Sequence, residues 1–305
     1  MNIVDIESQL KYITPHTINV MERIQLDIGL NNLNNTIECD ELLFWGKIAG
    51  IKADYLIAEA VFYEGKYEFP IKKFYWASNS DYKFEELPEL LDQHTELINK
   101  YNSTFFSGEP AQILENLEAP AGEGEGEPPA DGGDDNEGEG GEGAKDLDTE
   151  SEDDEVKIPP KNFTELDRLA FTVFAIENDC QVVPIGSIKL TPLHEVRKNE
   201  AFKGLTHDDA LLEESYLHFR SAQTKDKKDL NQKDDAIFRP DFIESIADDQ
   251  IKGSWSVQYD TTKSFVSIKS LLWPGYVAFH KLKCKLFGGV YIGDGIKNVD
   301  LPFML

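Results

Sequence analysis

The last part of the chain alternates between apolar and polar residues in the way that strands of an antiparallel sheet do. In 254–259, and again in 266–269, every second residue is apolar. Because successive side chains of a strand point to opposite faces, this alternation predicts two half-buried strands. The apolar runs 276–282 and 287–292 continue the series, so we predict an antiparallel meander in this part of the chain.

Two apolar runs nearer the N-terminus, 42–48 and 55–62, predict a β-hairpin. Both faces of each run are largely apolar, so we expect this hairpin to be buried on both sides. The turn-prone segment 50–52 joins the two runs, and a third strand is expected over 71–77. Strands are therefore predicted at both ends of the chain.

Apolar residues at helical spacing predict several short helices. Val20, Ile24 and Ile28 recur four residues apart, downstream of Thr14, which is a good helix-capping residue. Thr206 is expected to cap a later helix in the same way. The other predicted helices, with the one that Thr206 caps, cover 88–101, 163–177, 207–219 and 240–246. Since strands and helices do not alternate as in parallel βαβ units, the predicted fold class is α+β with an antiparallel β-sheet.

Most of the negative charge lies in one segment. The chain has 305 residues and a formal charge of −27; the segment 118–155 holds 17 acidic residues and one base, Lys145, so it carries −16 and the remainder −11. Such a Gly/Glu-rich composition cannot bury enough apolar surface to offset the entropy lost on ordering. We predict a long disordered acidic insertion over 118–157. It separates two halves of the folded body, 1–117 with helices and the β-hairpin and 158–305 with helices followed by the β-meander.

Charge and cysteine content limit the partners and the compartment. A negative surface repels the phosphates of nucleic acids and anionic lipids, so we expect neither nucleic acid nor membrane as a partner. The most hydrophobic stretch, 42–62, is interrupted by Lys47, Lys52 and Asp54 and does not suit a bilayer-spanning helix. Three widely spaced cysteines fit a reducing compartment better than a disulfide framework or a zinc site. Because the N-terminus also lacks a secretory signal, we expect an intracellular protein.

The sequence motifs do not point to catalysis. Gly293-Asp294-Gly295 has no third glycine and no following helix, so it predicts a hairpin turn and not a dinucleotide site. His207 and His218 would lie about 16 Å apart on one helix and could not share a metal ion. No segment has the G-x-S-x-G pattern of a nucleophile elbow. We therefore predict no catalytic residue, no cofactor and no metal site, and an enzyme is the weakest of the functional classes.

Aromatic residues near the ends of the predicted strands are the candidate functional residues. Trp and Tyr are enriched at protein interfaces, where they act as buried anchors. The candidate partner interface consists of Trp45, Tyr55, Trp255, Trp273, Pro274 and Tyr291. The alternative interpretation is that these side chains fill the core of the protein itself.

Six segments together resemble a known family. They are 43–48, 53–58, 215–220, 252–256, 270–275 and 297–305, the last being the most specific. In these segments, which span both halves, the chain resembles the radial spoke head protein 9 family. Members of that family are structural components of the radial spokes of motile cilia and flagella. The acidic insertion is a departure from the family pattern, so the resemblance implies no role for it.

The resemblance implies a non-catalytic subunit of the radial spoke head, placed in the axoneme within the cytoplasmic cytoskeleton. It implies that the subunit helps to assemble the head and to relay signals from the central pair to the dynein arms. The implied partners are other radial spoke head subunits, especially the larger, related radial spoke head proteins 4 and 6, with transient contacts to projections of the central pair. The acidic segment taken alone leaves a second interpretation, an acidic chaperone-like binder of basic proteins.

Overall fold

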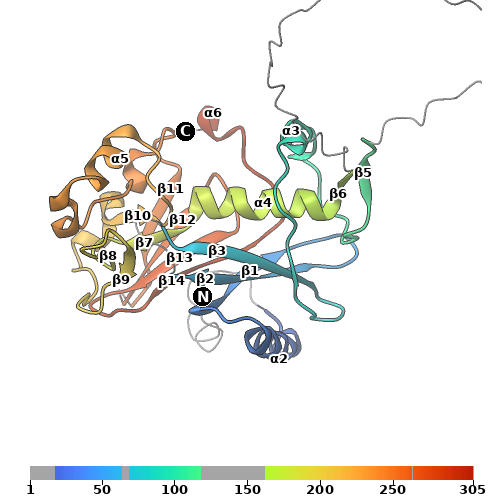
Figure 1. Ribbon diagram of the computed structural model, residues 1–305, viewed down its shortest axis with the longest axis horizontal. Coiled ribbons are helices and arrows are strands. Elements are labelled where there is room, and N and C mark those ends of the chain that lie inside the picture. Colours follow the sequence, from blue (N-terminus) through green and yellow to red (C-terminus); the bar gives the residue numbers. More distant parts are fainter. Residues whose placement is uncertain (1–17, 64–68, 118–161, 263, 305) are drawn as a thin grey trace, which may run out of the picture.

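An eight-stranded β-sheet with a helix on each face organises the protein. The computed structural model describes residues 18–63, 69–117, 162–262 and 264–304. In it α4 (Glu165–Cys180) lies across one face of the sheet and α2 (Val20–Thr36) lies against the other (Figure 1). The strands of the sheet are β1 (Glu41–Ile48), β2 (Tyr55–Phe62), β3 (Ile71–Ser78), β4 (Glu85–Glu86), β11 (Trp255–Tyr259), β12 (Phe265–Ser270), β13 (Tyr276–Lys281) and β14 (Phe287–Gly293).

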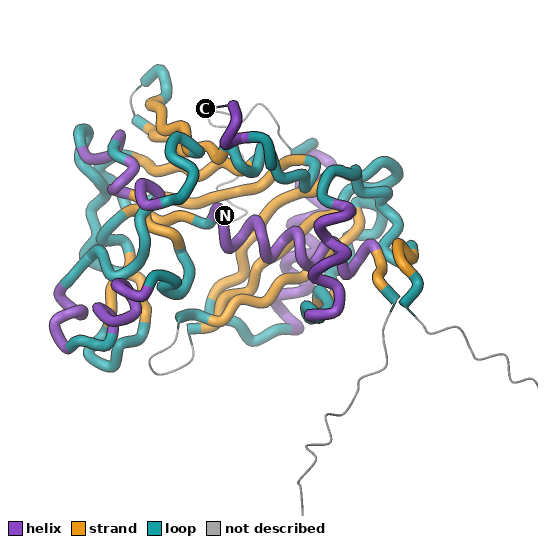
Figure 2. Tube along the Cα trace, turned by 90° about the horizontal axis from the view of Figure 1, so that it is seen from above, coloured by secondary structure: helices purple, strands orange, loops and turns teal. Residues whose placement is uncertain are grey.

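The remaining elements are short. The helices and strands are α3 (Thr95–Tyr101), β5 (Ile113–Glu115), β6 (Phe163–Thr164), β7 (Val182–Pro184), β8 (Ile188–Leu190), β9 (Val196–Lys198), β10 (Tyr216–His218), α5 (Lys225–Asn231) and α6 (Leu301–Met304). The 3₁₀ turns are η2 (Asp92–His94), η3 (Asp209–Leu211), η4 (Glu213–Ser215), η5 (Asp234–Phe238) and η6 (Ile246–Asp248). Strands β7 to β10 and α5 gather at one end of the sheet, whereas α3, β5 and β6 lie at the other (Figure 1); Figure 2 shows the same arrangement from above.

Strands from the two halves of the chain meet in the middle of the sheet. Its order is β11-β12-β13-β14-β1-β2-β3-β4, and every neighbouring pair is antiparallel except β14 and β1. The predicted α+β class with its antiparallel sheet is confirmed. The parallel pair was not predicted, because local patterns specify strands but not partners that lie far apart in the sequence.

Gly46 makes this parallel junction possible, because a side chain does not fit at its position. Gly46 lies opposite Tyr291, and a Cβ atom placed on it would lie 2.1 Å from the Tyr291 carbonyl oxygen. The preceding residue, Trp45, packs its ring 5.6 Å from the Tyr291 ring. Its indole N–H donates to Oε2 of Glu177 on α4 at 2.9 Å. The junction is therefore tied to the helix above it as well as to the strands.

The helix α4, predicted over 163–177, begins at a reciprocal cap. The Thr164 hydroxyl accepts from the backbone N–H of Asp167, and the Asp167 carboxylate accepts from the backbone N–H of Thr164. The apolar stripe that follows contains Leu169, Val173 and Ile176, all with no exposed surface. This stripe packs in the main core against β1, β2 and the C-terminal strands.

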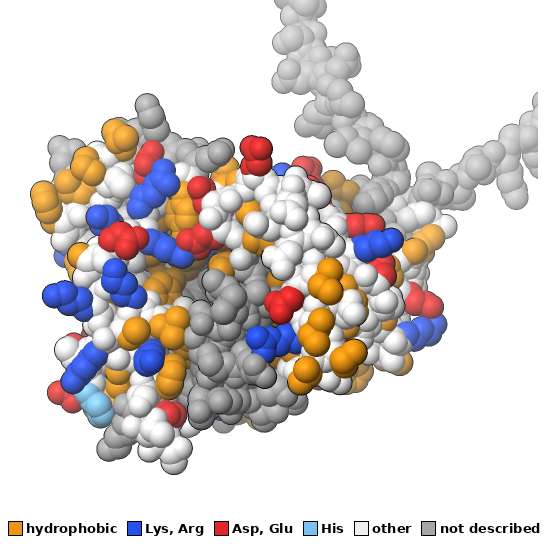
Figure 3. All heavy atoms as spheres, turned by 90° about the horizontal axis from the view of Figure 1, so that it is seen from below, with side chains coloured by type: hydrophobic (Ala, Val, Ile, Leu, Met, Phe, Trp, Pro, Cys, Tyr) orange, Lys and Arg blue, Asp and Glu red, His pale blue; other side chains and the backbone are white. Residues whose placement is uncertain are grey.

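The helix α2 covers the opposite face with residues that its sequence spacing did not single out. Leu26, Leu30 and Leu33 are buried against the sheet. Val20, Ile24 and Ile28, the apolar residues that predicted the helix, are instead about half exposed or more, at 66 %, 48 % and 52 %. Figure 3 shows the molecule from the side on which α2 lies, with apolar side chains gathered at the surface. The helix has apolar residues on two sides. The spacing of Val20, Ile24 and Ile28 therefore predicted that a helix forms here but not which side of it is buried.

Three local predictions are wrong. The helix expected over 207–219 is replaced by η3, η4 and β10, and Thr206 accepts from the backbone N–H of Asp209 at the start of a single 3₁₀ turn. The segment 240–246 forms no α-helix, and only its last residue, Ile246, lies in the turn η6. After Asp294-Gly295 the chain turns, with Gly295 at φ 69°, but no strand follows. The first two segments form 3₁₀ turns and strands too short to show a period, and the Asp-Gly pair specifies a turn but not the element that follows it.

Two expectations fall on parts of the chain outside the described residues. These are the cap at Thr14 and the acidic insertion over 118–157. The described parts of the predicted halves 1–117 and 158–305 both contribute strands to the one sheet.

The fit at Gly46 generates the first prediction. We expect Gly46→Ala to lower the free energy of unfolding by about 3 kcal/mol, because the new methyl group meets backbone that cannot move without separating β1 from β14. The matched control is Gly288→Ala in β14, whose Cβ would meet only the Phe279 ring, at 3.1 Å. We expect it to cost less than about 1 kcal/mol, since alanine is favoured over glycine within a strand. Urea denaturation measures both, and equal losses would contradict a special role for Gly46.

Candidate partner-binding surface

Four of the segments that carry the family resemblance meet at one small opening of about 230 Å³. His218 and Arg220 come from 215–220, Ser254 from 252–256, Leu272 from 270–275, and Lys297 from the C-terminal segment. The remaining lining residues are Asp179, Asp249, Gln250 and Ile251. Segments that are far apart in the sequence therefore build one surface.

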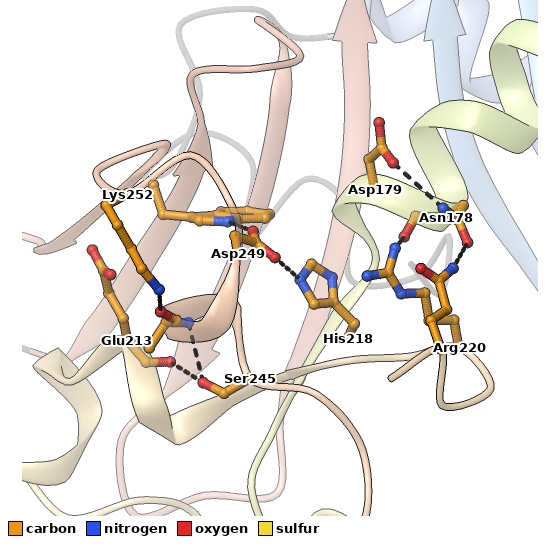
Figure 4. A network of polar contacts seen from close by, with 11 residues as sticks. Asn178, Asp179, Glu213, His218, Arg220, Ser245, Asp249 and Lys252 are labelled. Atoms are coloured by element: carbon orange, nitrogen blue, oxygen red, sulfur yellow. Dashed lines mark hydrogen bonds and ion pairs between the residues drawn. The ribbon is translucent and has the colours of Figure 1, made fainter. Parts of the chain in front are cut away.

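A buried histidine and a tryptophan share one carboxylate beside this opening. His218 has 1 % of its side chain exposed, and its Nε2 lies 2.9 Å from Oδ1 of Asp249 (Figure 4). The indole N–H of Trp255 donates to the other oxygen, Oδ2, at 2.7 Å. Burial acts to raise the pKa of Asp249, but the hydrogen bond and charge of His218, the Trp255 bond and the charge of Arg220 together lower it. The ionised carboxylate thus joins the loop after η6 to β10 and β11.

A second tryptophan and a lysine share the carboxylate of Asp179 at the end of α4. The indole N–H of Trp273 and the Nζ of Lys297 each donate to Oδ2 of Asp179, both at 2.9 Å. The Lys297 ammonium also lies 5.5 Å from the centre of the Trp273 ring, within the range of a cation–π contact. These contacts hold the C-terminal segment against α4.

Arg220 and the loop before β11 complete the polar network. Arg220 donates from Nη1 to the carbonyl oxygen of Asn178 at 2.5 Å, and its side chain lies between Asn178 and His218 in Figure 4. On the other side of Asp249, the Ser245 hydroxyl donates to the Glu213 carbonyl oxygen at 3.2 Å. These bonds join the segment after β10 to the end of α4, and the residue before η6 to η4.

Exposed apolar side chains lie beside the charged opening, on the C-terminal segment and on the loop to which it is bonded. The backbone N–H of Asn298 donates to the Leu272 carbonyl oxygen at 2.8 Å, and its side-chain amide lies 3.9 Å from the sulfur of Met304. The C-terminal patch comprises Leu271, Val299, Phe303 and Met304, which are 38 %, 62 %, 88 % and 71 % exposed. An apolar patch beside a charged rim is the usual anatomy of a protein interface.

The structure places five of the six predicted interface residues in the core. These are Trp45, Tyr55, Trp255, Trp273 and Tyr291, with at most 6 % of their surface exposed. Because the chain's own residues surround them, they offer no surface to a partner, and the alternative interpretation describes them better. Pro274 is exposed and lies in the loop that follows the C-terminal patch residue Leu271. Trp255 and Trp273 still matter to the surface, because their indole groups fix the carboxylates beneath it.

Among the described residues, the histidine that lines the opening is not bonded to a nucleophile. Nε2 of His218 faces a carboxylate, and its Nδ1 has no hydrogen-bond partner, so no nucleophilic hydroxyl or thiol is bonded to the ring. In the same described residues, no three His, Cys, Asp or Glu side chains are grouped so as to hold a metal ion. No described helix is long and apolar enough to cross a membrane.

Sequence reasoning missed the charged residues of this surface. His218 was assigned to a helix that does not form, and Asp179, Asp249 and Arg220 were not distinguished from the many other charged residues. The one usable signal was membership of a family-like segment, since four of these segments supply five of the nine lining residues. Their convergence in space could not be deduced from their order along the chain.

Comparison with known proteins gives the class of protein first. The model of a family described as radial spokehead-like protein matches residues 2–164. A radial spoke head protein 9 homolog of Danio rerio is 31 % identical over 290 residues, which cover 95 % of this chain and 94 % of that protein. Homologs of the same name from Bos taurus and Homo sapiens are each 32 % identical over 269 residues, covering 87 % of this chain and 85 % of each relative.

The chain therefore belongs to the radial spokehead-like protein family, and the resemblance to radial spoke head protein 9 is confirmed. It is a component of the radial spoke head, and its location is the axoneme of motile cilia or flagella. A structural family of this kind favours a non-enzymatic protein.

The carboxylate of Asp249 generates a prediction about stability. We expect Asp249→Asn to lower the free energy of unfolding by about 1–3 kcal/mol at neutral pH, because the charged acceptor shared by His218 and Trp255 is lost. A lowered pKa means that the carboxylate stabilises the fold above its unfolded pKa of about 3.9 and that this stabilisation is lost as the pH falls through the folded pKa. The difference between wild type and variant should therefore shrink at acid pH.

Asp248→Asn is the matched control, since Asp248 is the exposed neighbour. We expect it to change stability by less than about 0.5 kcal/mol. Urea denaturation of the three proteins between neutral pH and about pH 2 measures both effects, because the range must extend below the unfolded pKa of about 3.9. A loss for Asp249→Asn that stays constant over this range would show that its charge is not what stabilises the fold.

Proposed function

We propose that this subunit helps to assemble the radial spoke head by binding other head subunits through the C-terminal patch and the charged opening beside it. The partners that we propose are the larger, related radial spoke head proteins 4 and 6. The observation that carries the proposal is the convergence of four family-like segments on this surface. A surface built from the segments that carry the family resemblance suits a binding function common to the family.

The exposure of the C-terminal patch supports this proposal physically. Phe303 and Met304 are large apolar residues with 88 % and 71 % of their surface exposed, so water contact is unfavourable and burial by a partner is favourable. Aromatic residues and Met are enriched at the centres of interfaces. The charged groups around Asp179 and Lys297 suit the polar rim of such an interface.

We propose further that the subunit relays mechanical signals from the central pair toward the dynein arms. A rigid body suits such a role, because displacement at one end is carried to the other with little loss. The sheet that both halves share, with α4 tied across it, supports this role. The alternative function, an acidic binder of basic proteins, depends on the segment 118–157, which lies outside the described residues, and no described contact favours it.

The proposal predicts the behaviour of variants of the C-terminal patch. Phe303→Ser combined with Met304→Ser should reduce the affinity for radial spoke head proteins 4 and 6 by about 30-fold or more, equivalent to losing about 2 kcal/mol of interface burial. The melting temperature should be unchanged, because both side chains are exposed in the free chain. Co-purification of the full-length subunits and thermal denaturation of the variant measure the two quantities.

Phe238→Ser is the matched control, because Phe238 is equally exposed, at 83 %, but lies in η5 outside the proposed surface. We expect normal co-purification for this variant. Normal binding by the Phe303/Met304 variant would contradict the proposed interface. In axonemes, the same variant should leave spoke heads incomplete and alter the waveform, whereas a normal waveform with the subunit missing from the head would contradict the relay role.

A further inference from the structure

The two edges of the sheet are protected very differently. At one edge, β4 is only two residues long, and both of them, Glu85 and Glu86, are exposed. Short, charged edges of this kind discourage pairing with another chain. At the other edge, β11 has the sequence Trp-Ser-Val-Gln-Tyr, without a charge or a proline, and its five residues all favour or tolerate a strand. The edge at β11 therefore lacks the charges and prolines that usually protect sheet edges, although η3 contacts part of the strand.

The hydrogen bonds of β11 show which main-chain groups face outward. The Leu271 N–H donates to the Ser254 carbonyl at 2.8 Å, and the Asp260 N–H donates to the Phe265 carbonyl at 3.0 Å. Even-numbered residues thus bond to β12, so the main-chain groups of Trp255, Val257 and Tyr259 point away from it. Within the described residues these three positions form no main-chain hydrogen bond outside the β11–β12 pair.

We propose that β11 pairs in antiparallel fashion with β11 of a second copy of this chain, about a two-fold axis at Val257. Such pairing would join two eight-stranded sheets into one continuous sheet. It differs from the binding of other head subunits by the C-terminal patch and does not depend on it. The strand that we propose to bind this edge is β11 of the second copy. The test below also distinguishes it from a strand of a different protein.

The register of β11 is self-complementary. A two-fold axis places Val257 opposite the second copy's Val257, and Trp255 opposite the second copy's Tyr259. All of these positions are odd-numbered, so every outward N–H faces an outward carbonyl, and about six main-chain hydrogen bonds form. Trp255 and Tyr259 lie on the same face of the strand, where the Trp255 ring is buried in the core and the Tyr259 ring packs on His207, so the pairing rests on main-chain hydrogen bonds and not on these rings.

The charges at the ends of β11 are complementary under the same symmetry. Lys252 precedes the strand and Asp260 follows it, so antiparallel pairing brings Lys252 toward the second copy's Asp260. Lys252 is exposed, and its Nζ donates to the Ala247 carbonyl oxygen, so its charge is not neutralised by this contact. Strand residues Ser256 and Gln258 are uncharged, so no like charges meet between them. The overall charge of −27 opposes association, and salt should therefore strengthen the pairing by screening that repulsion.

Sedimentation equilibrium of the full chain tests the pairing directly. We expect a reversible monomer–dimer equilibrium whose dissociation constant falls as the salt concentration rises. A chain that remains monomeric up to about 100 µM, well above the affinity of even weak specific dimers, would overturn the proposal. So would association that grows beyond a dimer, because a two-fold pairing of edges is closed.

Two double variants that differ at one residue locate the contact. In the paired strands Ser256 lies opposite the second copy's Gln258. Ser256→Glu with Gln258→Glu, the like-charge variant, should weaken the dimer at least about tenfold, because two pairs of like charges meet across the axis. Ser256→Glu with Gln258→Lys, the opposite-charge variant, should restore the dimer to within about threefold of wild type, since each pair then attracts. Both variants carry Ser256→Glu, which lies opposite Lys269 of β12. Any effect of this substitution on folding is therefore the same in the two proteins.

The outcomes separate this inference from the proposed function. Equal dimerisation by the two variants would show that any dimer forms elsewhere and would overturn the inference. Loss of binding to the other head subunits in the like-charge variant, with no effect on self-association, would assign the edge to a strand of a different protein and would likewise overturn it. The Phe303/Met304 variant should dimerise as wild type does, whatever its affinity for head subunits.

Discussion

The parallel pairing of β1 with β14 at Gly46 is the contact on which the rest of the structure depends. It joins the antiparallel strands from the first half of the chain to the four-stranded antiparallel unit from the second. Beyond β14, the hydroxyl of Tyr291 accepts from the backbone N–H of Gly295 at 2.9 Å, which fixes the direction in which the chain leaves the sheet. The same chain then brings Lys297 to Asp179. The surface built by the C-terminal segment is therefore a consequence of the junction.

Buried charge accumulates beside this junction. Glu59 of β2 and Glu177 of α4 both face the ammonium group of Lys72, which is hydrogen-bonded to Glu177 and lies 3.8 Å from Glu59. Burial, and secondarily the charge of Glu177, raise the pKa of Glu59 to about 7. Because the folded pKa is raised, keeping Glu59 protonated stabilises the fold below its unfolded pKa, and this stabilisation is lost as the pH rises through the folded pKa of about 7. Beside the junction, Glu59 therefore gains or loses its proton at a pH of about 7.

The sequence predicted the parts of the fold that are encoded locally. Alternation identified the strands around Trp255 and Val266, and a helical period with a cap identified α4, because each pattern is produced by the residues of one element. The parallel junction at Gly46 has no local signature, since its requirement is the absence of a side chain opposite a distant carbonyl group. The helix wrongly expected around His218 shows the same limit, because 3₁₀ turns and three-residue strands are too short to have a period.

The sequence drew attention to some residues of the candidate surface, but it did not show which side chains are exposed or which ones meet. The tryptophans near strand ends were predicted as interface residues because Trp is enriched at interfaces, but a large aromatic side chain suits a core equally well, and burial decided between the two. What distinguishes Trp255 and Trp273 is that each indole N–H meets a carboxylate, Asp249 or Asp179, from another segment. The exposed residues that do form a patch, Phe303 and Met304, gave no periodic pattern because α6 is a single turn.

Native-state hydrogen exchange is the most direct test of the claim that both halves form one cooperative sheet through the junction. The account predicts that the slowest amides of β2, in the first half, and of β13, in the second, exchange through openings of the same free energy, because neither unit unfolds without the other. Opening free energies that differ by more than about 1 kcal/mol between the two strands would contradict it. Such a difference would show that the halves are separate folding units in contact and that the junction at Gly46 does not hold the sheet together.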